Sequence, residues 1–284
     1  MKKTINSEVL GLISKMNRED SPRGLKVVEE YLTTLEFDPL YPLMNFESKE
    51  FNWKYFIGEL WWYLTQETGI EKINNFSSFW KTLTVDDKVN SNYGYIMLSR
   101  QHNQFKWALD ALLKDKSTRQ AIMVFNTPQY QRDGVKDFVC TMYINLWIRD
   151  NKLNMKVQMR SNDIFYGLQY DAPFFSMVYQ SMYLLLREKY QDLEIGNYYH
   201  CSDNTHYYER HFPLVEKLKE EIQQGVNPDN DIQLRITKPL FVGTGSGISQ
   251  NAIDFVEYME QVHDFSVFNK YDYIEIFHKF FAEE

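Results

Sequence analysis

Cys140 and Arg160 are the residues of this 284-residue chain whose types and spacing point most directly to chemistry. Arginine is always charged and grips phosphate with two parallel hydrogen bonds. A nearby cation also lowers the pKa of a thiol and raises its thiolate fraction. The pair would therefore combine a nucleophile with an anion-binding group. The competing interpretation is a small buried cysteine beside a surface arginine, since free cysteine is among the most often buried residue types.

The segment between these two residues predicts a β-hairpin. Residues 141–148 alternate and are rich in β-branched and aromatic side chains, and residues 153–159 alternate again. The polar run 150–152 would turn the chain. We therefore expect the thiol of Cys140 and the guanidinium of Arg160 to be neighbours at the open end of the hairpin.

Further motifs stand in a fixed order around the hairpin. After Cys140 come Arg160-Ser161-x-Asp163, Gly167, Asp171 and Asp203-x-Thr205-His206-x-Tyr208, and before it stand Gly58-Glu59-Leu60-Trp61-Trp62, Asn92-Tyr93-Gly94 and Thr118-Arg119-Gln120. This ordered set, from about residue 18 to residue 212, resembles the thymidylate synthase superfamily. Three runs look closest to phage-type deoxycytidylate (dCMP) hydroxymethylases, namely Asn90-Ser91-Asn92-Tyr93-Gly94, Asp137-Phe138-x-Cys140-Thr141 and Met159-Arg160-Ser161-Asn162-Asp163.

The resemblance implies an α+β fold, in which a large mixed β-sheet is flanked by helices and packs against the sheet of a second subunit in a homodimer. It also implies one catalytic domain over residues 1–284, with a divergent C-terminal extension after about residue 225. Periodicity adds helices over residues 5–16, 51–68, 104–114, 174–190, 213–224 and from 250, and strands over 121–125, 192–201 and 231–242. The glycine-rich run 243–247 lacks the lysine of a phosphate loop and is interpreted as a turn.

The implied chemistry explains why a thiol is needed. Pyrimidine C5 is a poor nucleophile, and a thiolate added at C6 makes C5 enamine-like. C5 then attacks the methylene of the cosubstrate 5,10-methylenetetrahydrofolate, and loss of the C5 proton and of tetrahydrofolate leaves an exocyclic methylene on the base. Hydride from the folate gives a methyl group, whereas water gives a hydroxymethyl group.

By resemblance, Cys140 is the nucleophile and Glu59 organises water and proton transfer, while Tyr93 is a proton-relay candidate near Cys140. An acid inside so apolar a helix as that of Glu59 needs a partner or a raised pKa. The folate would meet Glu59, Trp80, Asp163 and Gly167, with Asp163 at the pterin ring.

The resemblance also assigns the nucleotide's phosphate and sugar. Arg160 and Ser161 would hold the 5′-phosphate with help from Arg23, for which Arg18 is a competitor. Arg119 would reach the phosphate bound by the partner subunit, so that two chains share each site, although Gln120 replaces the usual second arginine. His206 and Tyr208, two apart on an extended segment, would point the same way and bind a sugar hydroxyl.

Asp171 stands eleven residues after Arg160, where the family places the residue that reads the pyrimidine. An asparagine there matches the N3–H donor and O4 acceptor of uracil, whereas a carboxylate accepts from the N4 amino group of cytosine and can share a proton with N3. A buried acceptor left unpaired costs roughly 1–3 kcal/mol. We therefore expect dCMP as substrate and dUMP as a poor one. The alternative is that Asp171 caps a helix that begins before Phe174.

Hydroxymethylation is favoured over methylation by the end of the sequence. Synthases close over the folate with a short apolar segment, whereas this sequence ends Phe280-Phe281-Ala282-Glu283-Glu284, and a less sealed site would admit water. Two alternatives stay open, a methyltransferase of the thymidylate synthase type acting on dCMP or dUMP, and a non-catalytic nucleotide-binding relative.

Composition narrows the remaining possibilities. A net charge of −8 argues against a general nucleic-acid binder, and two cysteines indicate a reducing interior. The first residues do not form a signal peptide and no stretch is long enough for a membrane span, so we expect a cytoplasmic protein, phage-encoded by resemblance, with no membrane or nucleic-acid partner. His200, Cys201, His206 and His211 follow no familiar zinc spacing, so no metal is expected.

Overall fold

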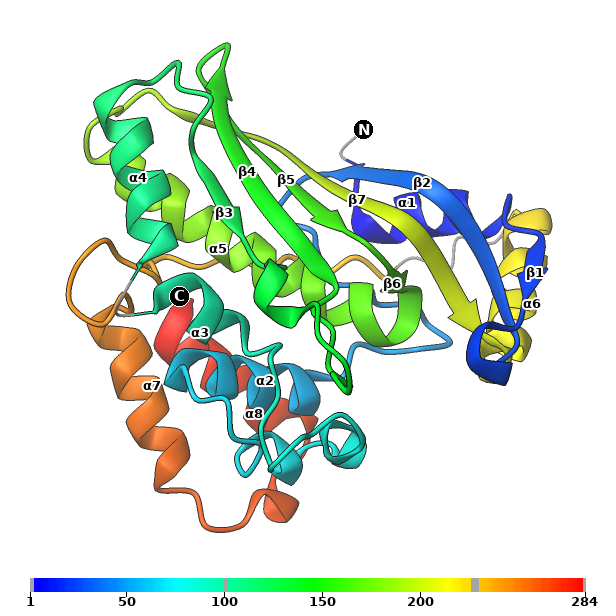
Figure 1. Ribbon diagram of the computed structural model, residues 1–284. Coiled ribbons are helices and arrows are strands. Elements are labelled where there is room, and N and C mark those ends of the chain that lie inside the picture. Colours follow the sequence, from blue (N-terminus) through cyan, green and yellow to red (C-terminus); the bar gives the residue numbers. More distant parts are fainter. Residues whose placement is uncertain (1–2, 100–101, 226–229, 283–284) are drawn as a thin grey trace.

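A mixed β-sheet backed by helices forms the framework of the protein in this computed structural model, which describes residues 3–99, 102–225 and 230–282 (Figure 1). Within these residues the sheet has seven strands in the order β1-β2-β7-β5-β4-β3, and β6 also pairs with β7. β5 and β6 run parallel to β7, and the other neighbours are antiparallel. The strands are β1 (Arg18–Asp20), β2 (Val27–Phe37), β3 (Ile122–Val124), β4 (Thr141–Arg149), β5 (Lys152–Met159), β6 (Asn162–Asp163) and β7 (Glu194–Tyr208).

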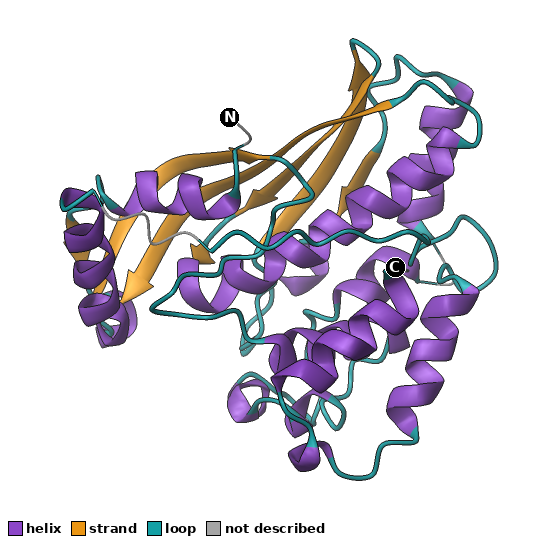
Figure 2. Cartoon of the chain, turned by 180° about the vertical axis from the view of Figure 1, so that it is seen from behind, coloured by secondary structure: helices purple, strands orange, loops and turns teal. Residues whose placement is uncertain are grey.

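Helices cover one face of the sheet and continue into a second, mainly helical part (Figure 2). α5 runs behind the sheet in the view of Figure 1, and the side chains of β4 and β5 on the covered face are almost wholly buried. The helices are α1 (Ile5–Ile13), α2 (Trp53–Thr65), α3 (Tyr93–Leu98), α4 (Gln104–Lys114), α5 (Gln169–Arg187), α6 (Phe212–Gln223), α7 (Gln250–Glu260) and α8 (Lys270–Phe281). The expected α+β class, with a large mixed sheet flanked by helices, is confirmed.

The β4–β5 hairpin forms as predicted. Asp150 and Asn151 make its two-residue turn with φ of 50° and 60°, the left-handed values that a tight hairpin turn requires. At the other end Thr141 pairs with Met159. The thiol-bearing and guanidinium-bearing residues are therefore side by side where the hairpin opens.

Two strands differ from the prediction. β2 was not anticipated from the sequence, yet it pairs with β7 along almost its whole length. β7 continues without a break to Tyr208, beyond the predicted end at residue 201. Polar residues in both strands hid this pairing, because the exposed face of the sheet accepts them without loss of the ladder.

The predicted strand over residues 231–242 is wrong. Within the described residues this segment has only an isolated bridge, between Phe241 and Ile248. Side chains of α5 satisfy part of its backbone instead, since Ile236 N donates to Gln180 Oε1 at 3.0 Å and Leu240 N to Ser181 Oγ at 2.9 Å. Leu234 N donates to the backbone carbonyl of Leu40 at 2.9 Å. Such bonds remove the need for a neighbouring strand. The glycine-rich run that follows is a turn before α7, as interpreted.

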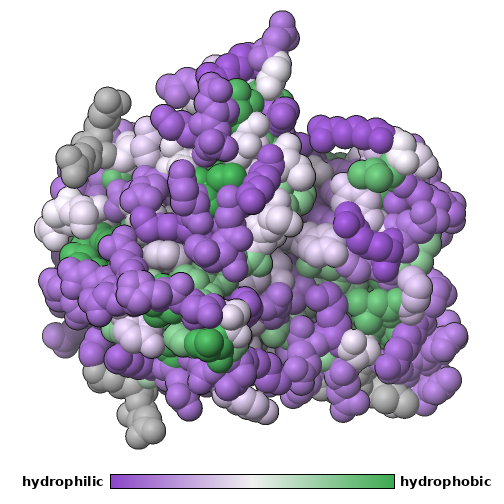
Figure 3. All heavy atoms as spheres, turned by 90° about the horizontal axis from the view of Figure 1, so that it is seen from below, coloured by the Kyte–Doolittle hydropathy of each residue, from purple (hydrophilic) through white to green (hydrophobic). Residues whose placement is uncertain are grey.

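Aromatic side chains join the helical part to the sheet. Trp53 of α2 packs on Phe277 of α8 with ring centroids 5.7 Å apart, and Tyr63 of α2 packs on Phe174 of α5 at 4.7 Å. The surface seen from below is mostly hydrophilic, with small separate hydrophobic patches (Figure 3). None of the helices in the described residues combines the length and the apolar character needed to cross a bilayer.

Candidate active site

Cys140 and Arg160 are in contact at the mouth of the hairpin. Arg160 N donates to the carbonyl of Cys140 at 2.9 Å, and Arg160 Nη2 lies 3.4 Å from Cys140 Sγ. Arg160 also donates from Nε to the carbonyl of Val139 at 3.1 Å and from Nη2 to the carbonyl of Phe138. These bonds fix the guanidinium beside the thiol and leave Nη1, which has no hydrogen-bond acceptor among the described residues, for an anion.

The expected lowering of the thiol pKa is not the net result. Burial raises the pKa of Cys140, and the guanidinium of Arg160 offsets this only in part. The carboxylates of Asp171 and Asp137 raise it further, while Arg23 lowers it. Desolvation outweighs the cation because Cys140 lies deep in the site. The net effect of these surroundings is to favour the thiol form of Cys140 over the thiolate.

Asp171 lies at the start of α5, within electrostatic reach of Cys140. Asn162 Nδ2 donates to Asp171 Oδ2 at 2.8 Å, and burial raises the pKa of Asp171 to about 7 despite this bond. Gly167 packs over the pair, since a Cβ at this position would meet Asn162 Nδ2 at 2.9 Å. One carboxylate oxygen is thus held in place, while Asp171 keeps part of its surface accessible.

The interpretation of Asp171 as a helix cap is wrong. α5 begins five residues before the expected Phe174, after a π-helical turn over Ile164–Leu168. Asp163 caps this π-helical turn, since its Oδ1 accepts from the backbone N–H of Phe165 at 2.7 Å and of Tyr166 at 3.0 Å, and α5 itself has no side-chain cap. Its Oδ2 is buried without a partner among the described residues, and burial raises its pKa to about 6. Asp163 therefore has an acceptor to offer a ligand.

Glu59 lies on α2, buried and only 6% exposed. Burial raises its pKa to about 8, although hydrogen bonds from Tyr55 and Tyr63 oppose the shift and Asp171 adds to it. Tyr55 Oη donates to Glu59 Oε1 at 2.8 Å, and the indole N–H of Trp80 donates to Tyr55 Oη at 3.1 Å. The acid has both the partner and the raised pKa that the sequence led us to expect.

Tyr93 stands in a fixed position between two rings. It is stacked on Tyr63 at 5.1 Å and on Phe175 at 5.4 Å between centroids. Its hydroxyl accepts from Thr141 Oγ1 at 2.9 Å, which leaves its own proton for another acceptor. Cys140 acts electrostatically on this hydroxyl, so Tyr93 lies close to the thiol as expected.

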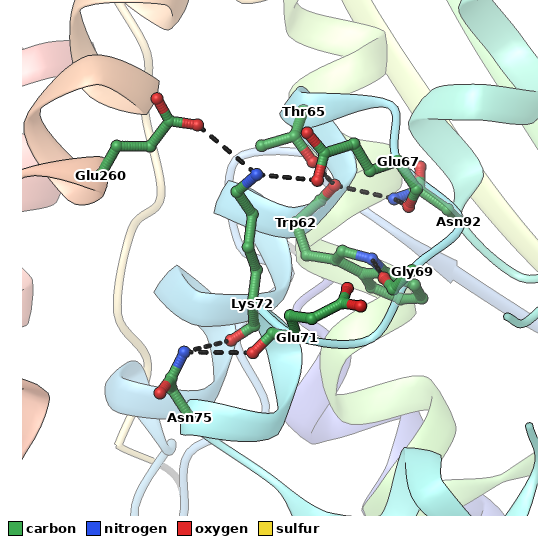
Figure 4. A network of polar contacts seen from close by, with 9 residues as sticks. All are labelled: Trp62, Thr65, Glu67, Gly69, Glu71, Lys72, Asn75, Asn92 and Glu260. Carbon is green, nitrogen blue, oxygen red and sulfur yellow. Dashed lines mark hydrogen bonds and ion pairs between the residues drawn. The ribbon is translucent and has the colours of Figure 1, made fainter. Parts of the chain in front are cut away.

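Two polar anchors hold Tyr93 in this place. Asn92 Nδ2 donates to the carbonyl of Trp62 at 2.7 Å and to that of Glu67 at 2.8 Å, which ties α3 to the end of α2 (Figure 4). The carboxylate of Asp137 accepts from Ser91 N at 2.7 Å and from Ser91 Oγ at 2.6 Å. The two motifs around Tyr93 and Cys140 are thus bonded to each other.

The geometry distinguishes the two arginines proposed for the phosphate. Arg23 lowers the pKa of Cys140, so its charge faces the site, and its φ of 57° is a left-handed value uncommon for a residue with a side chain. Arg18 instead lies over the ring of Tyr31, 4.9 Å from its centroid. Ser161 is half-buried beside Arg160. The arrangement favours Arg23.

Arg119 does not join the site of its own chain. The carbonyl of Ala121 accepts from Leu146 N at 2.9 Å, which sets this segment beside the far end of β4. About eight residues of strand then separate Arg119 from Cys140, or roughly 25 Å. Arg119 and Gln120 are exposed there.

His206 and Tyr208 point the same way, as expected, with ring centroids 5.2 Å apart. The histidines and the cysteine once considered as a zinc set diverge. His200 is buried and bonded to Tyr198, whereas Cys201 faces Thr34. The described residues contain no group of three or more metal-ligating side chains.

Sequence reasoning missed several residues that complete the site. Tyr55 bonds Glu59, Asn162 bonds Asp171, and Asp137 anchors the segment before Tyr93 through Ser91. Lys49 acts electrostatically on Asp163. The spacing of Tyr55 four residues before Glu59 on one helix face was a usable indication. Asn162 and Asp137 stand inside runs that carry the family resemblance, Asn162 next to Asp163 and Asp137 three residues before Cys140. Lys49 comes from a distant segment, and no local pattern reveals it.

Comparison with known proteins agrees with this geometry. A family model described as thymidylate synthase matches residues 11–261. The chain belongs to the thymidylate synthase family. Within this family it is a one-carbon transferase by relationship, and the family uses methylenetetrahydrofolate.

Three phage proteins illustrate the nearer relationships. The chain is 29% identical over 174 residues to deoxycytidylate 5-hydroxymethyltransferase of Enterobacteria phage T4, covering 58% of this chain and 71% of that one. It is 24% identical over 244 residues to deoxyuridylate hydroxymethyltransferase of Bacillus phage SP01, covering 79% and 61%. It is 28% identical over 182 residues to the protein of that name from Delftia phage PhiW-14, covering 60% and 50%.

Proposed function

We propose that this family member converts dCMP to 5-hydroxymethyl-dCMP with 5,10-methylenetetrahydrofolate. The observation that carries the proposal is the half-buried carboxylate of Asp171, which Asn162 holds within electrostatic reach of the thiol of Cys140. A carboxylate with a pKa of about 7 can share a proton with N3 of cytosine and accept from the N4 amino group. Uracil would place its O4 acceptor against an oxygen that has no donor once ionised.

The residues divide the covalent chemistry among them. Cys140 Sγ adds to C6, and Arg160 with Ser161 and Arg23 holds the 5′-phosphate so that C6 meets the sulfur. Tyr93, whose hydroxyl accepts from Thr141 and keeps its own proton, would pass a proton near C5. After the one-carbon unit is transferred, water attacks the exocyclic methylene, the electron pair moves into the ring, and loss of the Cys140 thiolate restores the C5–C6 double bond.

The folate side of the site is supported by an unsatisfied acceptor. Asp163 Oδ2 is buried without a partner among the described residues, and the amino and N–H groups of a pterin ring would supply donors. Trp80 is only 8% exposed and offers the cleft little surface. Gly167, which we also expect at the folate, packs closely on Asn162, so a side chain at this position would meet Asn162 Nδ2 at 2.9 Å.

Water as the final nucleophile is favoured by the relatives, whose names all specify hydroxymethyl transfer. The acidic residues at the end of the sequence support water as the nucleophile less than the relatives do. Glu283 and Glu284 lie outside the described residues. Phe281, the last residue of α8, is 1% exposed and packs on Phe255 at 5.0 Å, so it is part of the core.

We also propose that two copies pair through the face of the sheet that the helices leave uncovered (Figure 1). Its side chains are half-buried and include large rings, such as Trp147 stacked on Tyr199 at 5.9 Å. Pairing would bring Arg119 of each copy to the phosphate of the other. We take each copy to be one catalytic domain, because segments beyond residue 230 bond directly to α5, as Gln180 Nε2 does to the carbonyl of Leu234 at 2.9 Å.

Hydroxymethylation of dUMP is the second candidate, favoured by the relatives from phages SP01 and PhiW-14. Methylation and a purely binding role are the remaining alternatives. Product mass after incubation of the protein with methylenetetrahydrofolate and dCMP, dUMP or CMP distinguishes all four. We expect 5-hydroxymethyl-dCMP and no dihydrofolate.

A covalent ternary adduct with a 5-fluoropyrimidine nucleotide and methylenetetrahydrofolate should also appear by intact mass, and Cys140→Ser should abolish it. Methylated product with dihydrofolate, or a wild type that prefers dUMP, would overturn the proposal. Absence of the wild-type adduct would favour a binding role.

A further inference from the structure

We infer that Tyr55, held in place by Trp80, is a positioning residue for Glu59 that equips this carboxylate to take a proton from the attacking water. The inference rests on the proposed hydroxymethyl transfer and assigns a role in it to two side chains outside the covalent chemistry. It stands on a chain of two hydrogen bonds that runs from the 76–90 segment through α2 into the site.

The direction of this chain is fixed by chemistry. An indole N–H can only donate, so Tyr55 Oη accepts from Trp80 Nε1 at 3.1 Å. The hydroxyl hydrogen of Tyr55 then has one place to go, Glu59 Oε1 at 2.8 Å. Tyr55 lies one turn before Glu59 on the same helix, so the contact survives small movements of α2 as a unit.

Packing holds both donors in position. The ring of Tyr55 lies against Tyr170 of α5 with centroids 4.5 Å apart, and the indole of Trp80 lies 4.9 Å from that of Trp62. The rings of Tyr55 and Trp80 cannot turn away from Glu59 without losing these contacts. Oε1 of Glu59 therefore has a fixed donor in Tyr55, which orients the carboxylate that would act on water.

The bond also opposes the effect of burial on Glu59. Desolvation raises the pKa of the acid to about 8, and the hydrogen bonds from Tyr55 and Tyr63 are the influences that lower it. Removing the Tyr55 hydroxyl should raise this pKa further, so that less of the base is ionised at a given pH. The titratable groups that face Glu59 are Tyr55 and Tyr63 of α2, Tyr93 of α3, and Tyr170 and Asp171 of α5.

The attack of water on the exocyclic methylene needs a base such as Glu59, whereas the earlier steps do not involve this water. Water forms the new C–O bond and must give up a proton, whereas a thiolate from solution attacks the same methylene already deprotonated. Added 2-mercaptoethanol therefore competes with water as a nucleophile that needs no help from Glu59. The ratio of hydroxymethyl product to thioether product isolates the step that the inference concerns.

The experiment compares wild type with Tyr55→Phe, using [5-³H]dCMP, methylenetetrahydrofolate and a fixed concentration of 2-mercaptoethanol over pH 6 to 9. Tritium release measures the steps up to the exocyclic methylene, and mass spectrometry measures the two products. Tyr273→Phe is the control. It removes a buried hydroxyl of α8 that donates to the carbonyl of Phe265 at 3.1 Å. Trp80→Phe, which frees the Tyr55 hydroxyl, is a second test.

For Tyr55→Phe we expect the ratio of hydroxymethyl to thioether product to fall about tenfold or more near pH 7, as expected when a general base is impaired. The rate of hydroxymethyl formation should rise with pH only at values about 1–2 units higher than in wild type. The reason is that the ionised form of Glu59 loses a hydrogen bond. Tritium release should change far less. Trp80→Phe should act in the same direction but less, and Tyr273→Phe should match wild type.

An unchanged product ratio and pH dependence of hydroxymethyl formation in Tyr55→Phe would overturn the inference and leave the proposed function intact. A parallel loss of tritium release and both products, with no pH shift, would also overturn it, because that pattern indicates general damage to the site. A methylated product from wild type would overturn the proposed function and the inference together.

Discussion

Replacing Asp171 by asparagine tests most directly whether this residue recognises the pyrimidine base. Asn162 Nδ2 lies 2.8 Å from Asp171 Oδ2 and will require an oxygen there in the variant as well. The amide oxygen of the new residue would then face Asn162, and its NH₂ group would face the base. That group can donate to O4 of uracil, whereas with cytosine it would face the N4 amino group, which is also a donor.

The size of the change follows from the burial of this group. An unmatched buried polar group costs roughly 1–3 kcal/mol, and the variant both removes a match to cytosine and creates one to uracil. A combined change of about 2–4 kcal/mol corresponds to roughly 30- to 900-fold in the ratio of kcat/KM for dCMP to that for dUMP. The variant should keep its covalent chemistry, because Cys140 and Arg160 are untouched.

The pH dependence gives a second measure. Burial raises the pKa of Asp171 to about 7, so the proton shared with N3 of cytosine is lost as pH rises through this value. Wild-type kcat/KM for dCMP should therefore fall above about pH 7, and Asp171→Asn should lack this limb. Steady-state kinetics on both nucleotides over pH 6 to 9 provides both measures.

Asp192→Asn is the matched control, since it changes the net charge equally at an exposed position far along the sheet. It should leave the ratio as in wild type. If Asp171→Asn also leaves the ratio unmoved, Asp171 does not read the base and the assignment fails.

Two further predictions concern the framework and the shared site. Gly94→Ala should destabilise the fold by roughly 1–3 kcal/mol, because a Cβ there would lie 1.7 Å from the carbonyl oxygen of Tyr63, whereas Gly11→Ala, with nothing within 4 Å, should be neutral or slightly stabilising in thermal unfolding. Equal melting temperatures for the two variants would refute the close approach. Mixing inactive Cys140→Ser with inactive Arg119→Ala subunits should restore about a quarter of wild-type activity, since half of the dimers would have one intact site. No recovery after subunit exchange, or a strict monomer in sedimentation, would contradict sharing.

Local patterns in the sequence were enough for the hairpin and several helices. Alternation with a polar two-residue turn predicted the β4–β5 hairpin, and the 104–114 helix was predicted with its observed bounds. The nearness of Cys140 and Arg160 followed from the hairpin alone, because antiparallel pairing places the two ends of the segment together. These features depend on neighbours in sequence, which is why one chain was sufficient.

The tertiary structure decided what the groups at the site experience. The sequence indicated a cation beside Cys140 and so a lowered thiol pKa, but burial and two carboxylates reverse the net direction. It indicated a partner or raised pKa for Glu59 without showing that Tyr55 and Trp80 supply the donors. Desolvation is a property of everything that surrounds a group, so residue type and spacing cannot fix its sign or size.

The same reason explains the errors in the fold. Residues 231–242 have the composition of a strand, yet Gln180 and Ser181 of α5 satisfy some of their backbone groups from the side. Asp171 is of a residue type that often caps helices, yet α5 starts two residues before it and Asp163 caps the π-helical turn that precedes α5. The sequence by itself determined which residues are able to form strands, caps and a nucleophilic site. Only the packing of distant segments decided which of these possibilities each residue fulfils, because a backbone or carboxylate group binds whichever partner the fold brings within reach.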